Sequence, residues 1–132
     1  MYRLFLLLWL TACASQSQTD PKLLYQQRWQ ASQSQATAWF VLQADGRVQG
    51  NDGCNRFFGK VSINQRLDFG QVASTKMACQ QQNDRLFWEA VQKHDRWRMR
   101  NDELQLLQGK KVIFRFQKLA QAADEANRDA EE

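Results

Sequence analysis

Short segments that alternate between apolar and polar residues are the feature that most constrains the fold. In the segment Arg96 to Arg100, Trp97 and Met99 alternate with three arginines, so an extended strand here has one apolar and one charged face. In residues 112–116, Val112, Phe114 and Phe116 are expected to share one face of a strand. Turn residues separate such segments at Asp45-Gly46, Asn64-Gln65, Asn101-Asp102 and Gly109-Lys110. The pattern predicts an antiparallel sheet built from hairpins.

One segment has the period of a helix instead. Asn83 or Asp84 can cap this helix, and it should end near Lys93 or His94. Its apolar stripe consists of Leu86, Phe87, Ala90 and Val91. We interpret the stripe as core packing, which predicts an α+β fold: a small antiparallel, barrel-like β-sheet with one main helix packed on it.

The N-terminus has the pattern of an export signal. Arg3 precedes an unbroken apolar run from Leu4 to Leu10, which is too short for a bilayer span of about 20 residues. The run ends in Leu10-Thr11-Ala12-Cys13, which resembles the bacterial lipobox. We predict that residues 1–12 are a lipoprotein signal peptide and that Cys13 receives the lipid. A buried strand that happens to end in cysteine is the alternative, and its position and flanks argue against it.

The segments around the predicted domain are polar. Residues 13–21 have no apolar periodicity and should form a lipidated tether, residues 22–119 the domain, and residues 120–132 an acidic flexible tail. Ala14 follows the lipidated position, where an Asp would retain such a protein in the inner membrane. In a Gram-negative host we therefore expect an anchor in the outer membrane, on its periplasmic face.

Three cysteines leave two for the domain once Cys13 carries lipid. Cys54 and Cys79 would lie in an oxidising compartment, where they can form a disulfide. By closing a loop in the unfolded chain, this bond would stabilise the fold by about 3 kcal/mol. A redox or metal site is the competing interpretation. Redox motifs use closer spacing, and a metal site needs more ligands nearby. We predict the structural disulfide.

Charge is distributed unevenly along the chain, whose net charge is +4. Basic residues outnumber acidic ones between Lys22 and Lys118, whereas the last stretch is acidic. Arg96, Arg98 and Arg100 form a dense basic group that is a candidate face for an anionic partner. A solvated sheet face that keeps the protein soluble explains the same charges. Nucleic acid is not expected as a partner outside the cytoplasm.

Two segments are denser in special residues than a generic sheet requires, one from Asp45 to Gly59 and one from Ser74 to Cys79. Together with Trp29 they resemble the META domain, the HslJ-like family of small bacterial envelope proteins. The likeness covers about Tyr25 to Leu119. The matching positions are Gly50, Gly53, Cys54, Asn55, Phe57, Gly59, Thr75, Met77 and Cys79. The helix matches only in part, because the family often has acidic residues early in it.

These motif residues have a structural interpretation. Gly50 and Gly53 permit a tight turn or bulge, and Asn55 can bond nearby backbone groups and hold that turn. Cys54 would then join the turn to the segment before the helix. A ligand site is the alternative, and we favour the structural role.

No catalytic constellation is visible in the sequence. His94 is the one candidate imidazole base, and no phosphate-binding loop occurs. Asp52 and Asp68 can be imagined as a carboxylate pair, but turn and strand positions explain both. We predict no enzymatic activity, no cofactor and no metal.

The META resemblance implies a role in envelope maintenance or stress tolerance. The expected partners are the membrane, through the N-terminal lipid, and an unknown envelope protein or anionic lipid. The alternative is a periplasmic inhibitor or assembly factor, since small lipidated β-barrels also serve as lysozyme inhibitors and as pilotins. The Ser- and Tyr-bearing loop of lysozyme inhibitors is not apparent, because Tyr2 lies in the signal and Tyr25 near the domain's start.

Overall fold

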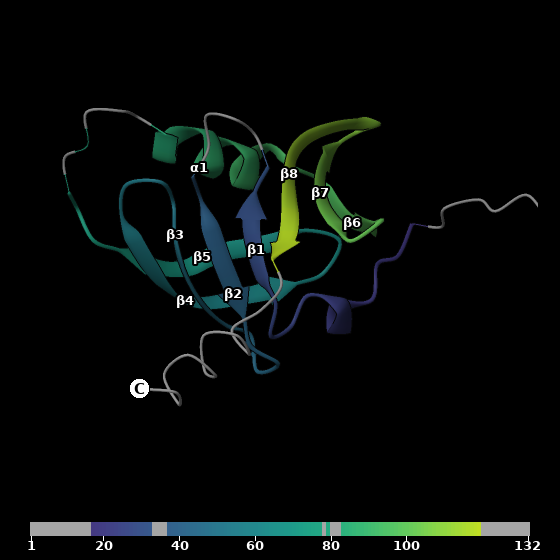
Figure 1. Ribbon diagram of the computed structural model, residues 1–132, viewed down its shortest axis with the longest axis horizontal. Helices are drawn as coiled ribbons and strands as arrows, with labels where there is room; N and C mark the ends of the chain where they lie inside the picture. Colours follow the sequence, from purple (N-terminus) through teal and green to yellow (C-terminus); the bar gives the residue numbers. More distant parts are fainter. Residues whose placement is uncertain (1–16, 33–36, 78, 80–82, 120–132) are drawn as a thin grey trace, which may run out of the picture.

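The computed structural model describes residues 17–32, 37–77, 79 and 83–119 (Figure 1). The predicted signal peptide, Cys13 and the acidic tail lie outside these residues. The described chain forms eight β-strands, one α-helix and one short 3-10 helix. Among these residues no helix is both long enough and apolar enough to cross a membrane.

All eight strands belong to one antiparallel sheet in the order β5-β4-β3-β2-β1-β8-β7-β6. Their bounds are β1 (Arg28–Ala31), β2 (Trp39–Leu42), β3 (Arg47–Asn51), β4 (Arg56–Ile63), β5 (Leu67–Ser74), β6 (Arg96–Arg100), β7 (Glu103–Gln108) and β8 (Lys111–Leu119). The sheet curves around the core but is not closed, because β5 and β6 are its edges (Figure 1). The predicted antiparallel sheet with one helix is confirmed, and the fold is mostly β.

The predicted hairpin turns occur where the sequence places them. Between β6 and β7, Asn101 and Asp102 both have positive φ, 53° and 60°, as a two-residue type I′ turn requires. Between β2 and β3, the N–H of Gln43 donates to the carbonyl of Arg47 at 2.8 Å. Gly46 takes the left-handed position of that loop with φ 89°.

Aromatic side chains fill the concave side of the sheet. Phe87 contributes from the helix, and its ring stacks on Phe57 with centroids 5.4 Å apart. Phe40 meets Phe116 edge to face at 5.0 Å, which joins β2 to β8. Trp29 on β1 is fully buried, and its indole N–H donates to the carbonyl of Leu24 at 3.1 Å. Burial of each such ring stabilises the fold by about 2–3 kcal/mol.

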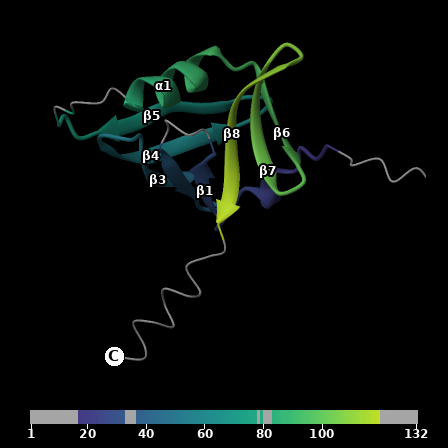
Figure 2. The ribbon, with the colours of Figure 1, turned by 45° about the horizontal axis from the view of Figure 1, so that its top comes forward.

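The helix α1 (Asn83–Lys93) lies across one end of the curved sheet and contacts β5, β7 and β8 (Figure 2). Phe87, Ala90 and Val91 are buried as predicted. The prediction for Leu86 is wrong, because its side chain is 38% exposed. Trp88 is half-buried and packs on Phe87 instead, so the buried face is rotated toward the β3–β4 turn.

The outer edge of β6 is occupied by two segments distant in sequence. The N–H of Gln18 donates to the carbonyl of Met99 at 2.8 Å, and the N–H of Met99 donates back at 2.6 Å. The N–H of Trp97 donates to the carbonyl of Gln65 in the β4–β5 turn at 3.0 Å. These bonds satisfy the groups that an edge strand would otherwise present to another chain.

The chain between Gln18 and β1 is ordered by its own contacts. A 3-10 helix, η1 (Pro21–Leu23), begins after Asp20, whose carboxylate accepts from the N–H of Lys22 at 3.0 Å. Leu24 then enters the core with no exposed surface. The described contacts of this segment therefore extend from Leu24 back to Gln18.

Candidate functional site

Asp52 organises the turn between β3 and β4. Its carboxylate is buried, with 2% of the residue exposed. Oδ1 accepts from the N–H groups of Cys54 and Asn55 at 2.9 and 2.6 Å. Oδ2 accepts from the indole N–H of Trp88 at 2.7 Å, so the same side chain joins the turn to α1. Three donors compensate the cost of burying this carboxylate.

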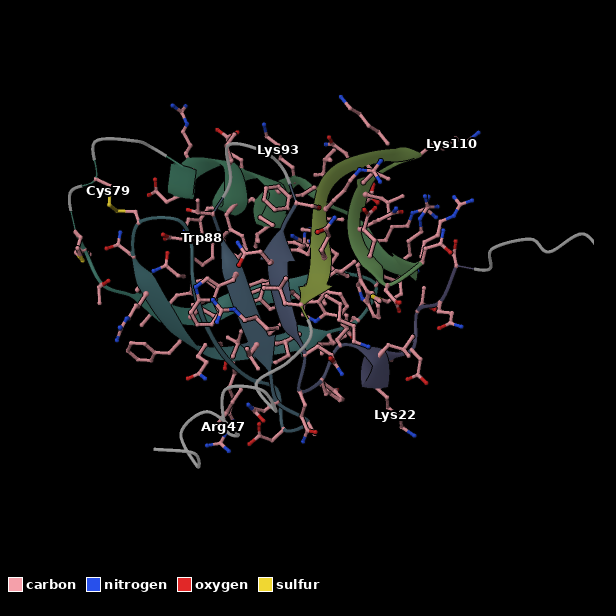
Figure 3. The ribbon with its side chains drawn as sticks, in the orientation of Figure 1. Lys22, Arg47, Cys79, Trp88, Lys93 and Lys110 are labelled. Carbon is pink, nitrogen blue, oxygen red and sulfur yellow. A yellow bond between two sulfur atoms is a disulfide. The ribbon has the colours of Figure 1, made fainter. Side chains whose placement is uncertain are left out.

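Asn55 joins the same turn to the segment that precedes the helix. Its Oδ1 accepts from the hydroxyl of Thr75 at 3.1 Å and from the N–H of Met77 at 2.6 Å. The structure therefore gives Asn55 a role across segments. The turn itself is held by Asp52 and by Asn51, whose Oδ1 accepts from the N–H of Gly53 at 2.8 Å. The disulfide between Cys54 and Cys79 links the same two segments, with Cα atoms 5.9 Å apart, and confirms the predicted pairing (Figure 3).

The motif glycines serve close packing and turn geometry. A Cβ at Gly50 would overlap the carbonyl oxygen of Trp39 and come within 2.7 Å of the Phe57 ring. Gly53 has φ 106°, which favours glycine. Gly59 lies within β4, where a Cβ would overlap the carbonyl oxygen of Gln71. The motif residues thus have packing and hydrogen-bonding roles, and only Met77 presents a large exposed side chain, 65% exposed.

His94 acts as a structural residue at the end of α1. Its Nε2 accepts from the N–H of Leu67 at 3.0 Å, so the proton lies on Nδ1, which donates to the carbonyl of Val91 at 2.6 Å. Burial lowers the pKa of the imidazole, which is 1% exposed. Both ring nitrogens are occupied by backbone groups, which leaves neither for proton transfer to a substrate.

The other polar candidates are separated in the structure. Asp52 lies in the β3–β4 turn, whereas Asp68 is exposed on β5 and accepts from the N–H of Gly70 at 2.8 Å. In the part of the chain that the structure describes, no group of three or more His, Cys, Asp or Glu side chains is arranged to hold a metal.

Arg96, Arg98 and Arg100 lie on the outer side of β6, opposite the buried Trp97 and Met99. Arg96 turns toward the end of the hairpin, where its Nη2 donates to the carbonyl of Gly109 at 2.8 Å. The side chain of Arg96 is therefore bonded to the β7–β8 turn and does not join Arg98 and Arg100 in one group.

A hydrogen-bonded chain extends Arg98 across β7 to β8. Nε of Arg98 donates to Oε1 of Gln105 at 2.7 Å, and Nε2 of Gln105 donates to Oε1 of Glu103 at 2.7 Å. The same oxygen of Glu103 accepts from Nη1 of Arg115 at 2.6 Å. Gln105 is buried, so it fixes the two flanking groups.

We call Arg98, Arg100 and Arg115 the arginine face. They border a shallow hollow of about 390 Å³ together with Asn101, Glu103 and Gln105. The hollow is lined by three guanidinium groups and by one carboxylate, that of Glu103. Its net charge is therefore positive, which suits a phosphate or carboxylate ligand. Sequence reasoning missed Arg115. The outward position of Arg115 in the β8 alternation was visible, but only the strand order places it beside Arg98.

The fold and the motif geometry define a class: a small, open antiparallel sheet with one helix, in which a disulfide joins the β3–β4 turn to the segment before that helix. The META domain family matches residues 22–121, and the chain belongs to this family. No curated protein matches the chain significantly. A protein from Burkholderia xenovorans, solved by NMR, has a similar fold with a TM-score of 0.62 and 21% sequence identity. The similarity covers 82% of this chain and 94% of that protein.

Proposed function

We propose that this chain is a non-enzymatic META domain lipoprotein, anchored through Cys13 to the periplasmic face of the outer membrane. In this role it helps to maintain the envelope, or to tolerate stress, by binding anionic groups of an envelope component. The arginine face makes that contact. The lipobox-like sequence at Cys13 supports the anchor, because an export signal and a lipidation site occur together.

The observation that carries the binding proposal is the chain of bonds from Arg98 through Gln105 and Glu103 to Arg115. These bonds hold two guanidinium groups in fixed positions, which reduces the entropy that an anion would otherwise lose in ordering them. Among the described residues each of these two arginines uses one nitrogen in this chain, so other N–H groups remain to donate to a ligand.

The absence of catalysis is part of the proposal. Its support is that His94 and Asp52 are buried and hydrogen-bonded to structural groups. A protein that acts by binding alone requires no titrating base.

The binding proposal is tested with two matched variants. Arg98→Gln/Arg100→Gln/Arg115→Gln removes the arginine face, and Arg47→Gln/Arg56→Gln/Arg85→Gln removes the same charge from exposed positions elsewhere. We expect the first variant to bind immobilised lipopolysaccharide about tenfold more weakly than the wild type, and the control to stay within about threefold. Equal losses in both variants would reduce the effect to net charge and end the proposal for this face.

The anchor and the alternative function have their own tests. Intact-mass analysis of the mature protein should show cleavage before Cys13 and a diacylglyceryl group on it. An unmodified N-terminus would remove the anchor from the proposal.

Inhibition of lysozyme by the purified protein would favour the inhibitor alternative instead.

A further inference from the structure

The distance between the lipid anchor and the folded domain is set by the backbone pair of Gln18 and Met99. This pair has two short hydrogen bonds of 2.8 and 2.6 Å, and from it the chain continues through η1 into the core at Leu24. Within the segment 13–21, Gln18 is held by this pair and Asp20 caps η1. Only the residues between Cys13 and Gln18 separate a lipid on Cys13 from the β6 edge.

The remaining tether is short on the scale of a membrane surface. Five residue steps from Cys13 to Gln18 span at most about 17 Å, the length of a fully extended chain. The attraction of a cation to an anionic surface extends about 8–10 Å in physiological salt. A lipid on Cys13 would therefore hold the β6 edge close to the headgroups.

The surface of the domain around Gln18 has the residue types that contact anionic lipid headgroups. Arg100 and Lys118 border a hollow of about 260 Å³ beside Gln18, together with Leu23, whose side chain is 36% exposed. Lys22 precedes Leu23 in η1. We call Lys22, Leu23, Arg100 and Lys118 the exit face. Asp102 also lines the hollow, and Asp20 caps η1, so the exit face has three cations with two carboxylates nearby.

We propose that the exit face rests on the anionic surface of the membrane that carries the anchor. Lys22, Arg100 and Lys118 would contact lipid phosphates, and Leu23 would enter the headgroup layer, as basic and apolar groups do together at membrane interfaces. This inference rests on the proposed lipid anchor and names the partner surface for the domain. It also sets the orientation of the domain on the membrane. Lys22 and Cys79 lie on opposite sides of the domain in Figure 3, so the side with Cys79 would face away from the membrane.

Lysine footprinting of the full-length lipidated protein tests the contact. The protein is reconstituted into vesicles of phosphatidylcholine alone or of phosphatidylcholine with phosphatidylglycerol, and the acylation rate of each lysine is read by peptide mass spectrometry. With anionic lipid we expect Lys22 and Lys118 to react about fivefold more slowly. Lys60 on β4 and Lys93 at the end of α1 serve as internal controls and should react at unchanged rates.

Two variants and one control substitution separate the orientation of the domain from its anchoring. A flexible Gly/Ser insertion after Ala14 lengthens the tether and should abolish the protection of Lys22 and Lys118. Arg100→Gln should weaken the protection, whereas Arg85→Gln on α1 should leave it unchanged. Protection that survives the insertion unchanged would show that the short tether is not the cause and would overturn the orientation argument.

The experiment distinguishes failure of the lipid anchor from failure of the exit face. A wild-type protein that does not partition into vesicles at all removes the lipid anchor from the proposed function, and the exit face fails with it. A protein that partitions but shows Lys22 and Lys118 as reactive as Lys60 keeps its anchor and refutes the exit face. Equal protection in both kinds of vesicle refutes the anionic contact.

Discussion

The buried carboxylate of Asp52 is satisfied by two backbone N–H groups and one indole N–H. Asp52→Ala leaves the indole N–H of Trp88 and two turn N–H groups without their acceptor, so we expect a loss of about 3 kcal/mol in the free energy of unfolding. Urea unfolding followed by circular dichroism measures it. Asp68→Ala, which removes one exposed acceptor, should cost about 0.5 kcal/mol. A loss at Asp52 no larger than at Asp68 would contradict this role.

His94 makes the stability depend on pH in a definite direction. Its pKa is lowered in the folded state by burial, and Nε2 must stay unprotonated to accept from Leu67. Below about pH 6.5 the unfolded chain therefore binds a proton that the folded chain does not, so stability is full above that pH and falls as pH decreases toward the folded pKa. Urea unfolding at about pH 7.5, 6.5 and 5.5 measures this. His94→Gln should flatten the profile in that range, and an equal slope in this variant would assign the effect to other groups.

Arg66 determines how α1 ends, although it comes from the β4–β5 turn. Its Nε donates to the carbonyl of His94 at 2.9 Å, and Nη2 donates to those of Val91 and Gln92 at 3.1 and 3.3 Å. A guanidinium here satisfies the last carbonyls and opposes the negative end of the helix dipole. Because Arg66 is largely exposed, Arg66→Met should cost about 1 kcal/mol and speed hydrogen exchange in the last turn of α1.

The matched control lies on the helix itself. Arg85→Met removes an exposed i,i+4 pair with Glu89 and should cost about 0.5 kcal/mol or less, with exchange in the last turn unchanged. If both variants change exchange there equally, Arg66 has no special role in ending the helix.

Local patterns predicted the elements because alternation and turn chemistry act between neighbouring residues. Trp97 and Met99 are buried as the β6 alternation indicates. Contacts between elements depend on strand order and register, which the sequence does not display. Arg115 lies near Arg98 because β7 pairs with both of their strands. Arg66 contacts α1 at Val91, which is 25 residues away in the sequence.

At the scale of the whole molecule, an open sheet needs contacts that keep its two ends around one core. Near one edge, the indole and backbone N–H groups of Trp97 on β6 donate to the β4–β5 turn, at Asn64 and Gln65. At the β3–β4 turn, the Cys54–Cys79 disulfide joins the sheet to the segment that leads into α1. The aromatic cluster between these contacts draws on strands from both halves of the sheet and on the helix.

The disulfide therefore restricts the segment that delivers α1 to the core, and its loss should weaken the whole domain. Its cysteines are 25 residues apart, so breaking the bond returns about 3 kcal/mol of loop entropy to the unfolded chain. Cys54→Ala/Cys79→Ala should lower the free energy of unfolding by that amount in urea, while the strands and α1 still form, because Asp52 and Asn55 still hold the turn and the segment. Dithiothreitol should reproduce the loss in the wild type and leave the double variant unchanged. If the reductant leaves the wild-type midpoint unmoved, the cross-link contributes nothing to stability, and the polar network alone holds the helix in place.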